Sequence, residues 1–150
     1  MTYKELTEKE KQSQTILDDF YVRNNWKFDR SVACKQYDLI INNVLIEEKF
    51  RYENYNDFLI ELLQDVITCN LGWYYKTGAN YLFYIVKDEY LYSLNWLKFK
   101  EWFIGELKKG IWFKPIISAQ GFGYTMNLAI KWDDIPKDFY KLFDLQAKLF

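Results

Sequence analysis

A chain of 150 residues with no histidine and a formal net charge of −1 excludes several classes of function. Without histidine there can be no Ser-His-Asp triad, no histidine-ligated zinc and no histidine general base. A nearly neutral chain has no overall attraction to nucleic acid, so any such binding depends on a local patch. Carboxylates, lysines and metal-bound water remain as the available chemistry.

Length and composition predict one compact domain in the cytoplasm. A chain of this size can bury roughly two-thirds of its unfolded surface in a single core. The sequence holds only two prolines and six glycines, and its short apolar runs are interrupted by charges. We therefore expect no linker, no signal segment and no membrane contact. Cys34 and Cys69 lack the spacing of metal ligands and are expected to be buried free thiols.

The first half of the chain predicts a helix followed by strands. Thr7-Glu8-Lys9-Glu10 has the form of a capping box, and apolar residues then recur at helical spacing, which predicts a helix over about 7–24. Alternation over 26–30 predicts a half-buried strand, and a hairpin follows at about 36–52. Residues 57–64 fit either a strand or a helix, because periodicity cannot distinguish the two over so short a run.

The second half adds further strands and two helices. Residues 81–86 predict a strand, with a turn at 87–89 into another strand. A helix is expected over about 94–109, since Gly110 is a good C-terminal stop. A strand at 126–130 precedes a last amphipathic helix that begins near Asp133 and carries Phe139, Leu142, Phe143 and Leu149. The predicted class is α/β, bordering on α+β, with a mixed sheet flanked by helices.

Aromatic residues make up 21% of the chain. Tyrosine and tryptophan rings could stack on bases. Four tryptophans recur at amphipathic spacing, however, and are expected in the core: Trp26, Trp96, Trp102 and Trp112.

The predicted hairpin carries the most informative residues of the chain. Asn42-Asn43 can adopt the positive φ angles of a two-residue turn, and a hairpin centred on it places Asp38 opposite Glu47. Side chains alternate along a strand, so Lys49 shares the face of Glu47 while Glu48 points the other way. Facing acids destabilise a sheet by roughly 0.2–1 kcal/mol. A divalent cation between Asp38 and Glu47 would relieve that repulsion.

This helix, strand and acidic hairpin resemble the core of the PD-(D/E)XK, or restriction-endonuclease-like, superfamily. Asp38 matches its metal-binding aspartate, Glu47 its second acid and Lys49 its lysine. The resemblance covers about residues 7–86, and leaves 94–150 as a C-terminal extension of the same domain. Short motifs downstream, in residues 58–61, 72–76 and 79–81, resemble a phage and prophage subgroup, which favours a strand over 57–63.

The resemblance implies a Mg²⁺- or Mn²⁺-dependent deoxyribonuclease that serves phage or mobile-element DNA processing. Asp38 and Glu47 would hold the metal, and Lys49 would hold the phosphate or position the attacking water. Glu61 and Gln14 are expected in supporting roles, Gln14 in place of a glutamate that the superfamily often carries on its first helix. The subgroup frequently has an acid where Asn80 stands. The residues do not distinguish DNA from RNA, and related cores often act as homodimers.

Two other functions remain open from the sequence. The uncharged Gln14 favours a nucleic-acid-binding module that keeps the fold without efficient cleavage. The near-neutral charge and many aromatics suit a protein-interaction or inhibitor protein on the same scaffold. Metal binding separates the nuclease from both alternatives, and salt-sensitive DNA affinity separates the alternatives from each other.

Overall fold

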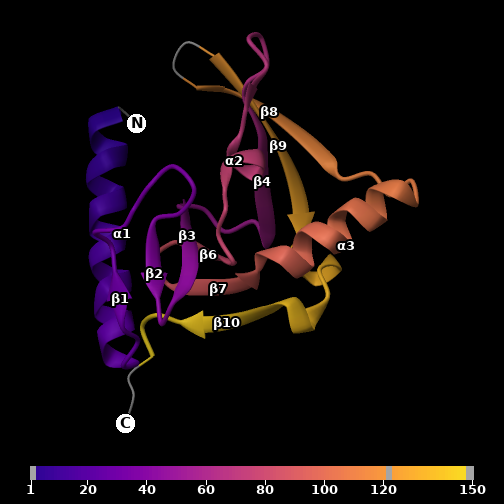
Figure 1. Ribbon diagram of the computed structural model, residues 1–150. Helices are drawn as coiled ribbons and strands as arrows, with labels where there is room; N and C mark the ends of the chain where they lie inside the picture. The colour runs from indigo at the N-terminus through magenta and orange to yellow at the C-terminus, as the bar shows by residue number, and fades with distance from the viewer. Residues whose placement is uncertain (1–2, 121–122, 148–150) are drawn as a thin grey trace.

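The computed structural model describes residues 3–120 and 123–147 as an α+β domain with two sheets (Figure 1). Three α-helices are present in these ranges: α1 (Tyr3–Arg23), α2 (Trp73–Lys76) and α3 (Trp96–Lys108). None of them is long and apolar enough to cross a lipid bilayer.

A mixed sheet of six strands forms the centre, in the order β1-β2-β3-β6-β7-β10. Its strands are β1 (Phe28–Asp29), β2 (Leu39–Ile41), β3 (Val44–Arg51), β6 (Tyr81–Val86), β7 (Tyr90–Asn95) and β10 (Tyr140–Asp144). The β3 and β6 strands are parallel, and every other neighbouring pair is antiparallel. The candidate hairpin β2–β3 therefore lies inside the sheet, between short β1 and long β6.

An antiparallel sheet of four strands, in the order β5-β4-β9-β8, accompanies it. Its strands are β4 (Asp57–Asp65), β5 (Asn70–Leu71), β8 (Lys114–Gln120) and β9 (Gly123–Lys131). The strand reading of residues 57–63 is thus confirmed. Since β4 pairs with β9, and β3 pairs with β6, both sheets combine strands from the two halves of the chain.

Two apolar cores cover the two faces of the six-stranded sheet. Leu17, Phe20 and Tyr21 of α1 pack on one face, with Phe83 and other inward residues of β2, β3, β6 and β7. The opposite core joins Leu82, Tyr84 and Leu94 to side chains of α3 and the four-stranded sheet. Strand alternation assigns consecutive residues of β6 to these different cores, so each face of β3 also meets a different environment.

Several predicted elements differ from the structure at their ends. The helix predicted over 7–24 is α1, but it begins at Tyr3, so Thr7 lies within the helix and does not cap it. The strand predicted over 26–30 is shorter in the structure, where β1 contains only Phe28 and Asp29. Both cysteines are exposed rather than buried. Trp96 is buried as expected, whereas Trp112 is 87% exposed.

The last predicted helix is wrong. Two 3₁₀ turns, η1 (Trp132–Asp134) and η2 (Lys137–Phe139), lead instead into the edge strand β10. Leu142 of β10 is exposed, and Phe143 packs beside the α1 core; Leu149 lies outside the described residues. Pairing with the open edge of β7 outweighs the weak helical preference of this segment.

Candidate active site

The turn of the β2–β3 hairpin has the predicted geometry. Asn42 and Asn43 have φ angles of 48° and 68°, the positive pair that a type I′ turn requires. The register follows from that turn, since Ile41 pairs with Val44 and Leu39 pairs with Ile46. The predicted turn and register are confirmed, but the predicted pair of Asp38 with Glu47 lies beyond the ladder, which ends at Leu39 and Ile46.

Asp38 lies one residue before β2, beside the backbone of β3. The ladder ends at the pair Leu39–Ile46, and the Asp38 N–H donates to the carbonyl of Ile46 over 2.9 Å. Its carboxylate Oδ2 accepts a 2.7 Å hydrogen bond from the backbone N–H of Glu48. The side chain thus takes the position that a β2 carbonyl would occupy, and it contacts β3 directly.

Glu47 and Lys49 lie together on one face of β3. The Lys49 ammonium is 2.7 Å from the Glu47 carboxylate and 5.4 Å from the centre of the Trp73 ring in α2. Glu47 is only 7% exposed. Burial raises the pKa of its carboxyl, Lys49 lowers it, and the nearby charge of Asp38 raises it again, so that the pKa lies above the ordinary value.

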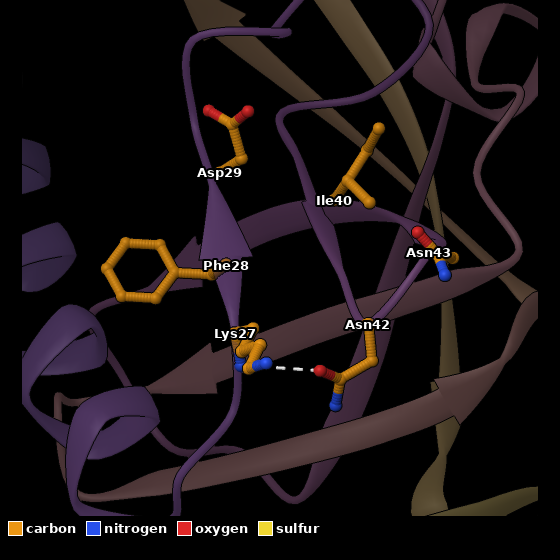
Figure 2. Close-up of a pocket in the computed structure, with 6 residues that line it drawn as sticks. All are labelled: Lys27, Phe28, Asp29, Ile40, Asn42 and Asn43. Atoms are coloured by element: carbon orange, nitrogen blue, oxygen red, sulfur yellow. Dashed lines mark hydrogen bonds between the residues drawn. The ribbon is translucent and has the colours of Figure 1, made fainter.

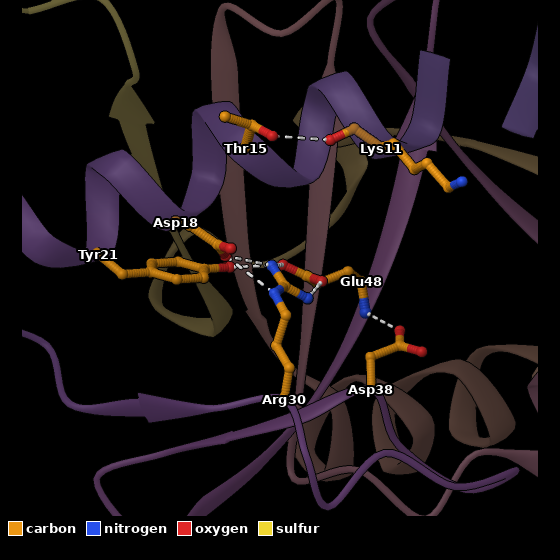
Figure 3. A network of polar contacts seen from close by, with 7 residues as sticks. All are labelled: Lys11, Thr15, Asp18, Tyr21, Arg30, Asp38 and Glu48. Atoms are coloured by element: carbon orange, nitrogen blue, oxygen red, sulfur yellow. Dashed lines mark hydrogen bonds and ion pairs between the residues drawn. The ribbon is translucent and has the colours of Figure 1, made fainter. Parts of the chain in front are cut away.

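Glu48 points to the opposite face, as strand alternation predicts, and is bound there in a polar network (Figure 3). Its carboxylate accepts hydrogen bonds from both terminal nitrogens of Arg30, at 2.5 and 3.0 Å, and from the Tyr21 hydroxyl at 2.8 Å. Arg30 also donates to Asp18 of α1 at 2.9 and 2.7 Å. We call Asp18, Tyr21, Arg30 and Glu48 the α1 clamp.

The charges of the α1 clamp depend on one another. Burial raises the pKa of Glu48, and burial together with Glu48 raises that of Tyr21. Burial alone would lower the pKa of Arg30, but its hydrogen bonds to Glu48 and Asp18 outweigh that effect and hold it above the ordinary value. The clamp therefore fixes α1, the loop after β1 and the middle of β3 to one another.

The clamp was not predicted from the sequence. Asp18 and Tyr21 lie three residues apart on α1, and three is a helical spacing that brings side chains to one face. Arg30 and Glu48 carry no comparable local signal, because only the packing of α1 on the sheet brings them together.

The two predicted supporting residues lie on elements other than the hairpin, Gln14 on α1 and Glu61 on β4. Gln14 is half-buried on α1, one turn before Asp18. Glu61 of β4 accepts a hydrogen bond from the backbone N–H of Trp73 over 3.3 Å, at the start of α2. Glu61 and Lys49 therefore both contact Trp73. The side chain of Asn80 accepts from the Leu45 N–H over 3.0 Å, which aligns β3 with the start of β6.

A separate open hollow lies at the outer edge of the sheet, between β1 and the hairpin turn (Figure 2). Among its lining residues, the backbone N–H of Lys27 donates to the Asn42 side chain over 3.3 Å. The remaining lining residues are Phe28, Asp29, Ile40 and Asn43. Asp38, Glu47 and Lys49 do not line this hollow.

The acids of the candidate site suit a hard cation with few protein ligands. Within residues 3–120 and 123–147, no three acidic or cysteine side chains are grouped so that they could hold a metal ion. Asp38 and Glu47 provide two carboxylates, and Mg²⁺ commonly uses one or two and keeps several waters. Glu47 is buried and Asp38 half-buried, and the charge of Asp38 opposes ionisation of Glu47, which a cation between them would relieve.

Comparison with protein-family models, with curated proteins and with solved structures found no match to this chain.

Proposed function

We propose that the chain is a metal-dependent nuclease that hydrolyses phosphodiester bonds of DNA, in the processing of phage or mobile-element DNA. Asp38, Glu47 and Lys49 are its proposed site residues. The observation that carries the proposal is a buried glutamate, Glu47, that shares one face of β3 with an ammonium group and lies within electrostatic reach of a second acid. Two acids that could hold a divalent cation, beside a lysine, are a suitable set for stabilising a phosphate under attack by water.

Each residue has a distinct proposed role. Asp38 and Glu47 would hold Mg²⁺ or Mn²⁺, which supplies neutralisation of phosphate charge and a water of lowered pKa. The hydrogen bond from the Glu48 N–H keeps the Asp38 carboxylate in place. Lys49 would donate to a phosphate oxygen or to the attacking water, and the Trp73 ring steadies its side chain. The α1 clamp holds β3 from its other face.

A nucleic-acid-binding module without efficient cleavage is the second candidate function. One observation favours it: Lys49 forms an ion pair with Glu47, so the charge of this carboxylate is balanced by a side chain of the same strand. In this alternative, Lys49 binds a phosphate, and affinity falls with salt.

A cleavage assay across metals and DNA forms tests the proposal. Linear, supercoiled, single-stranded and branched DNA would be incubated with Mg²⁺, Mn²⁺ or a chelator. We expect cleavage only with metal, and its loss in Asp38→Asn, Glu47→Gln and Lys49→Met. Glu101→Gln and Lys131→Met are matched controls, because both side chains are exposed and lie outside β2 and β3.

The contrary outcomes are equally specific. Cleavage that persists in chelator contradicts the metal-dependent mechanism. Variants that cleave like the parent chain remove Asp38, Glu47 and Lys49 from the site. If no DNA is cut but binding weakens steeply with salt, the binding-module function replaces the nuclease.

A further inference from the structure

Two adjoining hollows lie on the α1 face of the six-stranded sheet, and both are lined by Trp26, Tyr81 and Ser93. Strand register explains why these side chains share a face. Phe83 belongs to the α1 core and is opposite Ser93, which in turn is opposite Lys141 of β10. Residues directly opposite in an antiparallel pair project to the same side.

The two hollows differ in chemistry. The first, of about 200 Å³, is mainly apolar and extends from Trp26 toward Ile46 and Phe83. The second, of about 300 Å³, is more polar and extends toward Asn95, Lys98 and Lys141. Taken together they fall within the range of roughly 300–1,000 Å³ that is typical of ligand sites.

The polar end carries uncompensated positive charge. Lys98 and Lys141 are exposed, and neither forms an ion pair with any residue in the ranges 3–120 and 123–147. Asp138 is the acid among the lining residues, so two ammonium groups face one carboxylate. The half-buried rings of Trp26 and Tyr81 lie between this end and the apolar end.

We propose that this double hollow binds a nucleotide unit, a planar base that carries a phosphate. The base lies against Trp26 and Tyr81, since stacking on aromatic rings is how single-strand binding proteins hold bases without regard to sequence. The phosphate lies beside Lys98 and Lys141. Glu47 and Lys49 face the opposite side of the sheet, so this site is separate from the proposed nuclease site and does not depend on it.

Calorimetry in chelator tests the proposal without cleavage of the ligand. The probes are thymidine 5′-monophosphate, thymidine, inorganic phosphate and a single-stranded oligothymidylate. We expect the monophosphate to bind about tenfold more tightly than thymidine or phosphate alone, because only it uses both ends of the site. The combined change Lys98→Gln and Lys141→Gln should weaken monophosphate binding about tenfold and leave thymidine binding unchanged.

Further variants sharpen the test. Asp138→Asn should strengthen monophosphate binding, because it removes the opposing charge. Tyr81→Leu should weaken thymidine and monophosphate alike, and it avoids Trp26, whose ring also packs against Phe20, Tyr21 and Phe143. The combined change Lys87→Gln and Lys131→Gln is the matched control for lost charge, since both lysines are exposed and outside the hollows.

The affinity for the oligothymidylate shows whether the ligand is a free nucleotide or part of a nucleic-acid strand. Binding well above that of the monophosphate supports the site with a nucleic-acid strand as its ligand, and equal binding supports it with a free nucleotide. Phosphate binding equal to that of the monophosphate overturns the proposal, and so does unchanged affinity in the Lys98 and Lys141 variant. Dissociation constants above about 1 mM for every probe also overturn it.

Discussion

The Asp38 carboxylate accepts a hydrogen bond from the backbone N–H of Glu48 over 2.7 Å, just before β2 begins and beside the middle of β3. This contact satisfies a backbone donor that the shorter strand leaves without a carbonyl partner. Burial is the main cause of the raised pKa values of Glu47 and Glu48 on the two faces of β3, and the negative charge of Asp38 adds to the rise in both. One side chain therefore links sheet geometry to the electrostatics of the candidate site.

Asp38→Ala should destabilise the fold more than Asp38→Asn. Alanine leaves the Glu48 N–H without an acceptor, which costs about 1–3 kcal/mol if the group stays buried. Asparagine keeps an acceptor oxygen and removes the repulsion with Glu47, so the free energy of unfolding should stay close to that of the parent. Urea denaturation in chelator measures both. Equal losses of unfolding free energy in the two variants would show that Asp38 stabilises the fold through its charge and not through this hydrogen bond.

Lys49→Ala should be destabilising at neutral pH because it leaves Glu47 buried without its cation. The pair is intermediate between an exposed and a buried salt bridge, since the side chains are 29% and 10% exposed. A loss of about 1–3 kcal/mol is expected. In a Glu47→Gln background the same change should cost less, and a double-mutant cycle measures the difference. Additive losses would mean that Lys49 stabilises the fold through Trp73 instead.

Arg30→Met should be the most destabilising single change in the α1 clamp. Arg30 is the one clamp residue that binds both Asp18 and Glu48, and its loss leaves the nearly fully buried Glu48 carboxylate with only Tyr21. Breaking a buried pair in this way typically costs about 3–5 kcal/mol. Glu48→Gln should recover part of that loss in the double variant. Thermal denaturation of the four proteins tests this, and failure of the rescue contradicts the clamp.

The hairpin was predictable because its signals are local. Asn42-Asn43 has few alternatives to a tight turn, and strand alternation then determines that Glu47 and Lys49 share a face while Glu48 does not. The α1 clamp depends instead on contacts between residues as far apart as Tyr21 and Glu48. No periodicity in the sequence reports how α1 is placed on the sheet, so the partners of Glu48 could not be predicted.

Tertiary pairing also explains the elements that the sequence misplaced. The segment of β10 has apolar residues at helical spacing, but it lies against the free edge of β7 and forms a five-residue ladder there. Trp112 fits an amphipathic pattern with α3. It follows Gly110, however, whose φ of 84° cannot continue the helix, and the Trp112 ring is exposed. The local sequence pattern identifies which side chains can be buried, whereas strand pairing decides which of them are buried in the fold.

Gly72→Ala should be strongly destabilising, because β4 and the start of α2 approach too closely for a methyl group. A Cβ at Gly72 would lie 2.3 Å from the carbonyl oxygen of Glu61 and 2.7 Å from its carbonyl carbon. Backbone atoms cannot rotate away as a side chain can, so we expect a loss of about 1–3 kcal/mol or more. Gly105→Ala on α3 is the control, since a Cβ there meets no atom within 4 Å. In denaturation experiments, Gly105→Ala should leave the free energy of unfolding unchanged or raise it.

Glu47→Gln should change how stability depends on pH. Burial, with Asp38, raises the pKa of Glu47 in the folded chain above its unfolded value, so between these two values the folded state binds more protons than the unfolded state. Stability contributed by the protonated group is therefore present at low pH, and it is lost as pH rises through the folded pKa. Glutamine has no proton to lose, so the variant should escape this decline.

The measurement is the free energy of unfolding of both proteins in chelator, from about pH 4, near the ordinary glutamate pKa, to pH 7. The advantage of Glu47→Gln over the parent should grow as pH rises from the ordinary glutamate pKa and level off once pH exceeds the raised pKa of the folded chain. Mg²⁺ should reduce that advantage, because a bound cation favours the ionised carboxylate in the parent alone. Glu101→Gln, an exposed change on α3, should follow the parent throughout. An advantage that stays constant with pH would show that Glu47 ionises equally easily in the folded and unfolded chains.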